Sequence, residues 1–234
     1  MRERHRTYVL VHGAWHGGWC WRHVAARLRE AGHEVHTPTL TGLGERAHLA
    51  GPEIGLRTHV DDLLGLLGYE DLRDVVLVGH SYAGLVVREA ADRVPERVSR
   101  IVMVDAWAAR DGESLEDLAP AFFLDWIESV TVDGMIPPSS AAAVGVTDPD
   151  QVAWLEPRLT AHPRRTFSEP TRLTGAVDTI ECRAVLCTPD GPMPFPRLAG
   201  EYGWAADVLD AGHDVMVTEP RALADILLRH TYPA

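Results

Sequence analysis

The run Gly79-His80-Ser81-Tyr82-Ala83-Gly84 follows an apolar, β-branched segment over residues 75–78 and opens an amphipathic stretch. Strand, tight turn and helix in this order are typical of the turn that presents a nucleophilic serine at the end of a buried strand. Such a turn strains its central residue, so the positions beside it must be small, as Gly79 and Ala83 are. The pattern predicts that Ser81 is a nucleophile, although an ordinary strand-turn-helix joint would use similar residues.

A serine nucleophile needs a base and an acid, and proteins with this turn carry the acid before the histidine in the chain. Residues 184–188 are predicted to form a buried strand, and Asp190 lies just past its end. A second short strand, over 208–210, leads through a glycine to His213. A serine hydroxyl is a poor nucleophile near neutral pH, so His213 would take its proton while Asp190 orients the imidazole. We therefore predict a catalytic triad of Ser81, Asp190 and His213.

Two other carboxylates compete with Asp190 for the role of the acid. Asp105 follows the strand predicted over residues 101–104, so it also lies at the carboxyl end of a strand. Asp210 is a weaker rival, because its position suits a turn or a supporting role. Asp190 itself precedes Gly191-Pro192 and would also suit an ordinary turn. The order of the residues favours Asp190 and leaves Asp105 as the alternative.

A glycine-rich loop, HGAWHGGW over residues 12–19, follows the first predicted strand at 8–11. Glycine allows the backbone of such a loop to approach a substrate, and the usual second donor is the residue after the nucleophile. We predict that the main-chain N–H groups of Ala14 and Tyr82 form an oxyanion hole. The alternative is a tight strand-to-helix turn in which glycine serves geometry alone.

Strands and helices alternate along the chain, which predicts a mostly parallel sheet with helices on both faces. The predicted strands cover 8–11, 34–37, 75–78, 100–105, 184–188 and 208–210, and the predicted helices cover 19–31, 56–67, 82–93 and 218–229. Residues 107–178 interrupt this alternation, with helical pieces over 115–130 and 150–159. We predict one structural unit, with a core of residues 1–106 and 179–234 and an inserted helical cap of residues 107–178.

A cap at the active-site end of the sheet would exclude water and shape the pocket. The residues predicted to line the substrate pocket are Trp15, His16, Phe122, Phe123, Trp126, Met135 and Trp154. Apolar cap residues also pack against each other, so each of them could instead be part of a core. The proline-rich run over 192–196 is predicted either to form another wall or to stiffen a loop.

Five segments in order resemble the α/β-hydrolase superfamily: VLVHGAWHGGWCW, AGHEVHTPTLTGLGERAHL, VVLVGHSYAG, VLCTPDG and LDAGHDVMVTEP. Within it, the chain is similar to the group of plant salicylate methylesterases, hydroxynitrile lyases and bacterial esterase-like proteins. The resemblance implies the α/β-hydrolase fold and a serine esterase that cleaves a methyl or aryl ester without a cofactor. It also places the nucleophile at Ser81, the acid at Asp190 and the base at His213.

The same resemblance separates esterases from lyases. Hydroxynitrile lyases of this group carry a lysine after the catalytic histidine and a threonine in the oxyanion loop. This chain has Asp214 and Gly13 at those places, and all 22 of its basic residues are arginine. The cation that would stabilise departing cyanide is missing, so ester hydrolysis is favoured.

Composition excludes several other function classes. The 234 residues have a formal net charge of −12, which disfavours nucleic acid and anionic membranes as partners. No stretch approaches the roughly 20 apolar residues of a membrane span, and the apolar run after the basic start is too short for a signal peptide. The three cysteines lack metal-ligand spacing. We expect no metal or cofactor, a cytoplasmic monomer or homodimer, and a small-molecule ester as the partner.

Other functions remain possible on this scaffold. The absence of lysine with abundant arginine and alanine suggests a GC-rich bacterial genome, in which relatives often accompany natural-product pathways. The alternatives are a larger lactone or polyketide ester, and cyclisation or carbon–carbon cleavage. A ligand-binding receptor with an intact or degenerate triad is a further alternative; a stoichiometric burst without turnover would favour it, whereas steady turnover would favour the enzyme.

Overall fold

The computed structural model describes residues 5–188 and 191–229. Its centre is a six-stranded sheet in the order β2-β1-β3-β4-β7-β8, in which every neighbouring pair is parallel. The strands are β1 (Thr7–Val11), β2 (Glu34–His36), β3 (Val75–His80), β4 (Val98–Val104), β7 (Glu181–Thr188) and β8 (Ala205–Asp210). β3 is completely buried, as expected for a central strand covered on both faces.

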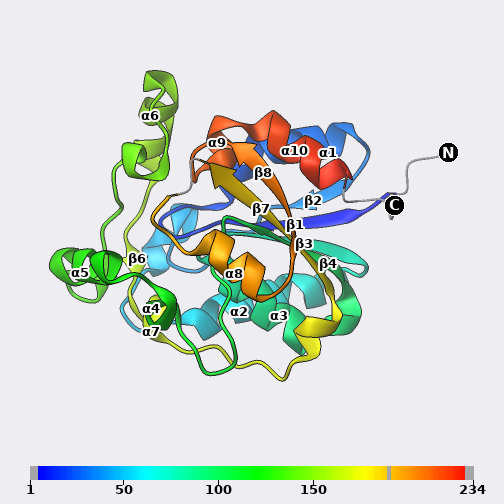
Figure 1. Cartoon of the computed structure of the whole chain (residues 1–234), viewed down its shortest axis with the longest axis horizontal. Helices are drawn as coiled ribbons and strands as arrows, with labels where there is room; N and C mark the ends of the chain where they lie inside the picture. The colour runs from blue at the N-terminus through cyan, green and yellow to red at the C-terminus, as the bar shows by residue number, and fades with distance from the viewer. Residues whose placement is uncertain (1–4, 189–190, 230–234) are drawn as a thin grey trace.

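Helices cover both faces of this sheet (Figure 1). On one face lie α1 (Arg22–Glu30), α9 (Val215–Thr218) and α10 (Pro220–Arg229), and on the other lie α2 (Leu56–Tyr69), α3 (Ala83–Arg93) and α8 (Phe195–Glu201). Side chains of β1 alternate between the two cores, with Tyr8 and Leu10 in one and Val9 and Val11 in the other. The architecture confirms the predicted fold class.

Residues 107–178 join β4 to β7 and form a separate group of short elements beside the sheet (Figure 1). The helix predicted over 115–130 is divided into two helices, because Pro120 lacks the N–H that a continuous helix would use. A two-stranded antiparallel sheet in this segment was not predicted. The elements are α4 (Leu115–Leu118), α5 (Ala121–Val130), β5 (Met135–Ile136), α6 (Pro149–Leu155), β6 (His162–Pro163) and α7 (Arg165–Ser168).

Of the two expectations for the proline-rich run, a pocket wall or a stiffened loop, helix α8 corrects the second. Pro194 caps the helix and Pro196 lies in its first turn. Proline is compatible with a helix at these positions, because the first N–H groups of a helix have no partner within it. The run therefore ends in a helix whose first residue, Phe195, is buried.

Within the described ranges 5–188 and 191–229, no helix is long and apolar enough to cross a membrane. The same residues contain no group of three or more histidine, cysteine, aspartate or glutamate side chains suited to hold a metal ion.

Candidate active site

Ser81 lies between the end of β3 and the start of α3 with a φ of 52°, in the left-handed region that non-glycine residues rarely adopt. Neighbouring segments hold this conformation. The Ser81 N–H donates to the carbonyl of Val104 at 3.1 Å, and the Trp107 N–H donates to the Ser81 carbonyl at 3.1 Å. Backbone strain of this kind is found where a structure must present a functional side chain.

The small residues around Ser81 are required by close packing. A Cβ at Gly79 would lie 2.9 Å from the Ala83 carbonyl oxygen, and a Cβ at Gly84 would overlap the Trp107 carbonyl oxygen. These contacts involve backbone, which cannot rotate away from a new side chain. The turn therefore tolerates alanine at position 83 but needs glycine at 79 and 84.

His213 is paired with Asp105. Its Nδ1 lies 3.0 Å from Asp105 Oδ2, and the main-chain N–H of Cys187 donates to the other carboxylate oxygen at 2.9 Å. Asp105 directly follows β4, and its own N–H donates to the Val185 carbonyl of β7 at 2.8 Å. Two residues of the neighbouring strand β7 therefore hold Asp105, with its carboxylate aimed at the imidazole.

The acid favoured by the sequence, Asp190, lies outside the described residues. Among the described residues, the alternative acid, Asp105, contacts His213. The carboxylate accepts a hydrogen bond from Nδ1–H, which leaves the lone pair of a neutral imidazole on Nε2. This is the tautomer that a general base for a serine hydroxyl requires.

Two aromatic rings enclose the imidazole of His213. Phe195 stacks on it with ring centroids 5.3 Å apart and an angle of 7°, while the ring of His80 lies 4.6 Å away at 42°. His80 Nε2 also donates to the His213 carbonyl at 2.9 Å. Burial, with the nearby His213, holds the pKa of His80 well below its usual range. The neighbour of the base is therefore a neutral ring.

The glycine-rich loop lies against the nucleophile. A Cβ at Gly13 would be 2.9 Å from Ser81 Cβ and 2.8 Å from His80 Nδ1, so only glycine allows this approach. Tyr82 is the N-cap of α3, where main-chain N–H groups point out of the helix. The Tyr82 hydroxyl is hydrogen bonded to His59 at 2.9 Å. Donation from Ala14 and Tyr82 to an oxyanion stays a prediction.

A cavity of about 810 Å³ opens at this site and is lined by Ser81, Asp105 and His213. Four of the predicted pocket residues line it: Trp15, Phe122, Phe123 and Trp126. The proline-rich run also forms part of its wall, through Pro192, Met193, Phe195 and Pro196. Contact of these side chains with a substrate stays a prediction.

Three predicted pocket residues do not line this cavity. His16 is buried in an ion pair with Asp214. Met135 lies in β5, paired with Pro163. Trp154 packs edge-on against Trp19 with ring centroids 5.2 Å apart. Nothing in the local sequence separates these residues from the four that do line the cavity.

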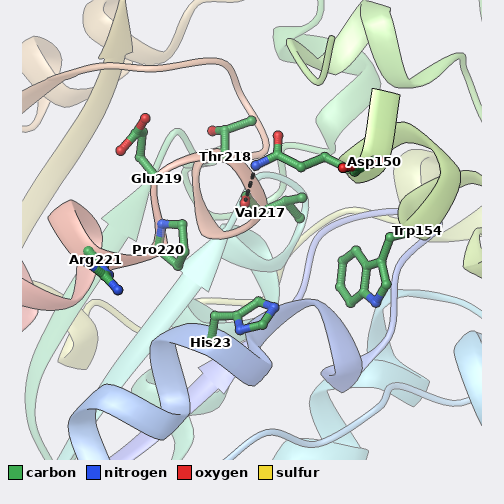
Figure 2. A pocket seen from close by; sticks show the side chains of 9 residues that line it. His23, Asp150, Trp154, Val217, Thr218, Glu219, Pro220 and Arg221 are labelled. Atoms are coloured by element: carbon green, nitrogen blue, oxygen red, sulfur yellow. Dashed lines mark hydrogen bonds between the residues drawn. The ribbon is translucent and has the colours of Figure 1, made fainter. Parts of the chain in front are cut away.

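Trp154 instead lines a second pocket of about 450 Å³, which Figure 2 shows between α6, α1 and the α9–α10 turn. Gln151 closes one side of this pocket by donating to the Val217 carbonyl at 3.3 Å. His23, Glu219 and Arg221 also line this pocket and are exposed. This pocket contains none of the residues predicted for catalysis.

Trp107 and Phe195 line the main cavity and were not among the predicted pocket residues. The position of Trp107, two residues after Asp105 at the carboxyl end of a strand, was a usable signal. Phe195 had a weaker signal, because its run had been identified only as a wall or a stiff loop.

Six parallel strands with a strained serine after a central strand define the class of protein as an α/β hydrolase. The model of the alpha/beta hydrolase family matches residues 8–226, so the chain belongs to this family. It is 40% identical to a carbendazim hydrolyzing esterase from Nocardioides over 94% of this chain and 98% of that protein. It is 27% identical to a probable esterase from rice over 98% of both chains.

Solved structures agree with this assignment. An extracellular α/β-hydrolase from Paenibacillus, described as sharing homology with tobacco salicylic acid binding protein 2, superposes with a TM-score of 0.86. It is 25% identical over 96% of this chain and 98% of its own. A methylesterase from Arabidopsis has the same fold, with a TM-score of 0.80 and 21% identity over 96% of this chain and 98% of its own. The chain is thus an enzyme of the carboxylic ester hydrolase class.

Proposed function

We propose that this enzyme is a serine esterase in which Ser81 is the nucleophile, His213 the base and Asp105 the orienting acid. The observation that carries this proposal is the 3.0 Å contact between His213 Nδ1 and Asp105 Oδ2. Ser81 and His213 line the same cavity, which supports transfer of a proton between them. Asp105 replaces Asp190 in the role of the acid.

The reaction follows from these positions. His213 Nε2 takes the proton of Ser81 as Oγ attacks the ester carbonyl, and Asp105 stabilises the imidazolium that forms. The N–H groups of Ala14 and Tyr82 donate to the oxyanion of the tetrahedral intermediate. His213 then gives the proton to the departing alcohol, which leaves an acyl-enzyme. A water molecule, deprotonated by His213, attacks the acyl carbonyl and releases the acid and the serine hydroxyl.

The lining of the cavity supports an aromatic methyl or aryl ester as the substrate. The rings of Phe123 and Trp126 are nearly parallel, with an angle of 26° and centroids 5.7 Å apart. Flat apolar surfaces of this kind favour flat rings. The Nocardioides relative is named for hydrolysis of carbendazim, a methyl carbamate on a bicyclic aromatic ring, and a cavity of about 810 Å³ has room for such a molecule.

We further propose that residues 107–178 act as a cap on the core of residues 1–106 and 179–234. Phe122, Phe123 and Trp126 of this segment lie in the cavity wall, where they exclude water from the acylation step. A cytoplasmic location is proposed as well, supported by three cysteines that are all free.

The test measures hydrolysis of p-nitrophenyl acetate, methyl benzoate and carbendazim by the unmodified protein and by Ser81→Ala. A fluorophosphonate, which phosphonylates activated serines, is used in parallel, and mass spectrometry locates the label. We expect turnover of at least the aromatic ester and a label on Ser81. Ser81→Ala should lower turnover by about 10⁴-fold or more and should not be labelled at this position. A label elsewhere, or unchanged activity in Ser81→Ala, would contradict the proposal.

A further inference from the structure

The residue after the base, Asp214, is fully buried and does not line the active-site cavity. Its Oδ2 lies 2.9 Å from Nε2 of His16, and the two side chains are 0% and 4% exposed. Neither residue has a part in the proton transfers described above. A buried ion pair contributes little stability compared with an apolar pair of the same size, because both charges must be desolvated. Its place beside His80, whose ring centroid lies 6.4 Å from that of His16, therefore calls for a role beyond folding.

The hydrogen bonds of His16 define its protonation state. Nδ1 lies 2.7 Å from the carbonyl oxygen of Ala14, which can only accept, and Nε2 faces the carboxylate of Asp214. With Asp214 ionised, both ring nitrogens donate and the side chain is an imidazolium. Burial alone would lower the pKa of His16, but Asp214 and the Ala14 carbonyl raise it. Burial would raise the pKa of Asp214, but the charge of His16 lowers it.

The ion pair joins the loop that carries the proposed oxyanion donor to the loop that carries the base. His16 holds the carbonyl of Ala14, whose N–H is the proposed oxyanion donor. Asp214 is bonded to His213 through the backbone, and its N–H donates to the Val144 carbonyl at 3.0 Å. His80, next to the nucleophile, donates to the carbonyl of His213. The other titratable groups that interact electrostatically with Asp214 are His80, His213, Cys20 and Cys187.

We propose that His16 and Asp214 are positioning residues, whose buried ion pair fixes the loop of the base His213 to the loop of the oxyanion donor Ala14. This inference rests on the proposed function of Ser81 and His213. Rate depends steeply on such alignment, since a displacement of about 1 Å at an active site costs up to about 10²-fold. The pair would act on the rate of bond formation and leave the aromatic part of the cavity unchanged.

The test compares Asp214→Asn, His16→Gln and the double variant with the unmodified protein. Asp214→Asn keeps the shape of the side chain and a neutral hydrogen bond but removes the charge. The matched control is Asp225→Asn, which removes the same charge from an exposed ion pair with Arg27. The readouts are the rate at which the fluorophosphonate labels Ser81, and kcat and KM for a p-nitrophenyl ester. Thermal unfolding shows that each variant is folded at the assay temperature.

We expect Asp214→Asn to lower kcat and the labelling rate about 10-fold or more, while its KM changes less than twofold. The control Asp225→Asn should leave all three quantities unchanged. The double variant should lose much less than the product of the two single losses, because the two side chains act as one unit. Unchanged kcat in folded Asp214→Asn, or losses that simply multiply, would overturn the inference. No labelling of the unmodified protein would overturn the proposed function, and the inference with it.

A measurement on the unmodified protein does not depend on turnover or on the folding of a variant. The ¹⁵N resonances of the His16 ring distinguish an imidazolium from a neutral imidazole. We expect both ring nitrogens to carry protons at pH 7 in the folded protein. A neutral His16 ring at pH 7 would overturn the inference even if Ser81 is labelled normally.

Discussion

Asp105 Oδ2 lies 3.0 Å from Nδ1 of His213, although 108 positions separate the two residues in the chain. Asp105 follows β4, while His213 lies in the loop after β8, two strands away in the sheet. The carboxylate also accepts a hydrogen bond from the main-chain N–H of Cys187, near the end of β7. The contact makes Asp105 the residue to test first.

Asp105→Asn should lower kcat by about 10³- to 10⁴-fold, because an amide no longer fixes the tautomer with its lone pair on Nε2 or stabilises the imidazolium. Asp190→Asn, the matched control, should stay within about threefold of the unmodified enzyme. Steady-state hydrolysis of a p-nitrophenyl ester measures both. The reverse ranking of the two variants would restore Asp190 as the acid.

Gly13→Ala should lower kcat at least 10-fold, because its Cβ would press on Ser81 and His80. Gly65→Ala serves as the control, since a Cβ there in the middle of α2 meets nothing within 4 Å. That substitution should stabilise the protein by about 0.5–1 kcal/mol through helix propensity and leave kcat unchanged. Kinetics and urea unfolding of both variants check the prediction. Full activity in Gly13→Ala would show that the loop does not need glycine at this contact.

Trp126→Ala should raise KM for an aromatic methyl ester about 10-fold and change KM for p-nitrophenyl acetate much less. The side chain lines the cavity and packs on Trp15, with ring centroids 6.0 Å apart. A buried aromatic contact of this size contributes about 1–2 kcal/mol to binding. Trp154→Ala removes the same ring from the second pocket and should leave both KM values unchanged. Equal effects of the two variants would argue against the proposed substrate site.

Acid should destabilise the fold between pH 6.5 and about 4. Burial lowers the pKa of His12 to about 3 and that of His59 to about 4, and it holds the pKa values of His80 and His162 well below 6.5. As the pH falls through 6.5, the unfolded chain binds protons at these residues but the folded protein does not. Stability is therefore fully present above pH 6.5 and is lost below it, by about 1.4 kcal/mol per pH unit for each titrating histidine.

Urea unfolding at half-unit steps from pH 7.5 to 4.5 measures this slope. His59→Gln is the informative variant, because its side chain can still accept from the Tyr82 hydroxyl and donate to the Thr41 carbonyl. The variant should be less stable at pH 7. Its free energy of unfolding should also fall less steeply as the pH is lowered, by the slope that one proton contributes. A flat stability profile between pH 6.5 and 4.5 would contradict the neutral state of these buried rings.

Local sequence patterns were sufficient to predict much of the fold. The six predicted strands and the helices beside them are present, with boundaries that differ by a few residues. Helix α8 was not predicted, because closely spaced prolines such as Pro192, Pro194 and Pro196 are typical of a loop. In the structure, Pro194 and Pro196 lie at the start of the helix, where proline is tolerated. The small pair of strands β5 and β6 was missed because two residues in each carry no periodic signal.

Pocket residues were harder to predict than strands. Trp126 and Trp154 are both half-buried tryptophans on predicted helical pieces of the same segment, yet they lie in different pockets. Which face of a short helix meets the sheet depends on packing with distant residues. The ion pair of His16 with Asp214 was hidden for the same reason, since 198 positions separate its partners.

Local sequence was enough to predict the strand-turn-helix around Ser81, the glycine-rich loop beside it and the position of His213 after a late strand. Each of these is a local requirement, because small residues and strand ends are visible within a few positions. The choice between Asp105 and Asp190 was different. Both follow strands that are neighbours in the sheet, β4 and β7, so spacing could not rank them. The contact between Asp105 and His213 became visible only in the tertiary structure, because it depends on how the residues after β4 and β8 meet at the carboxyl ends of the strands.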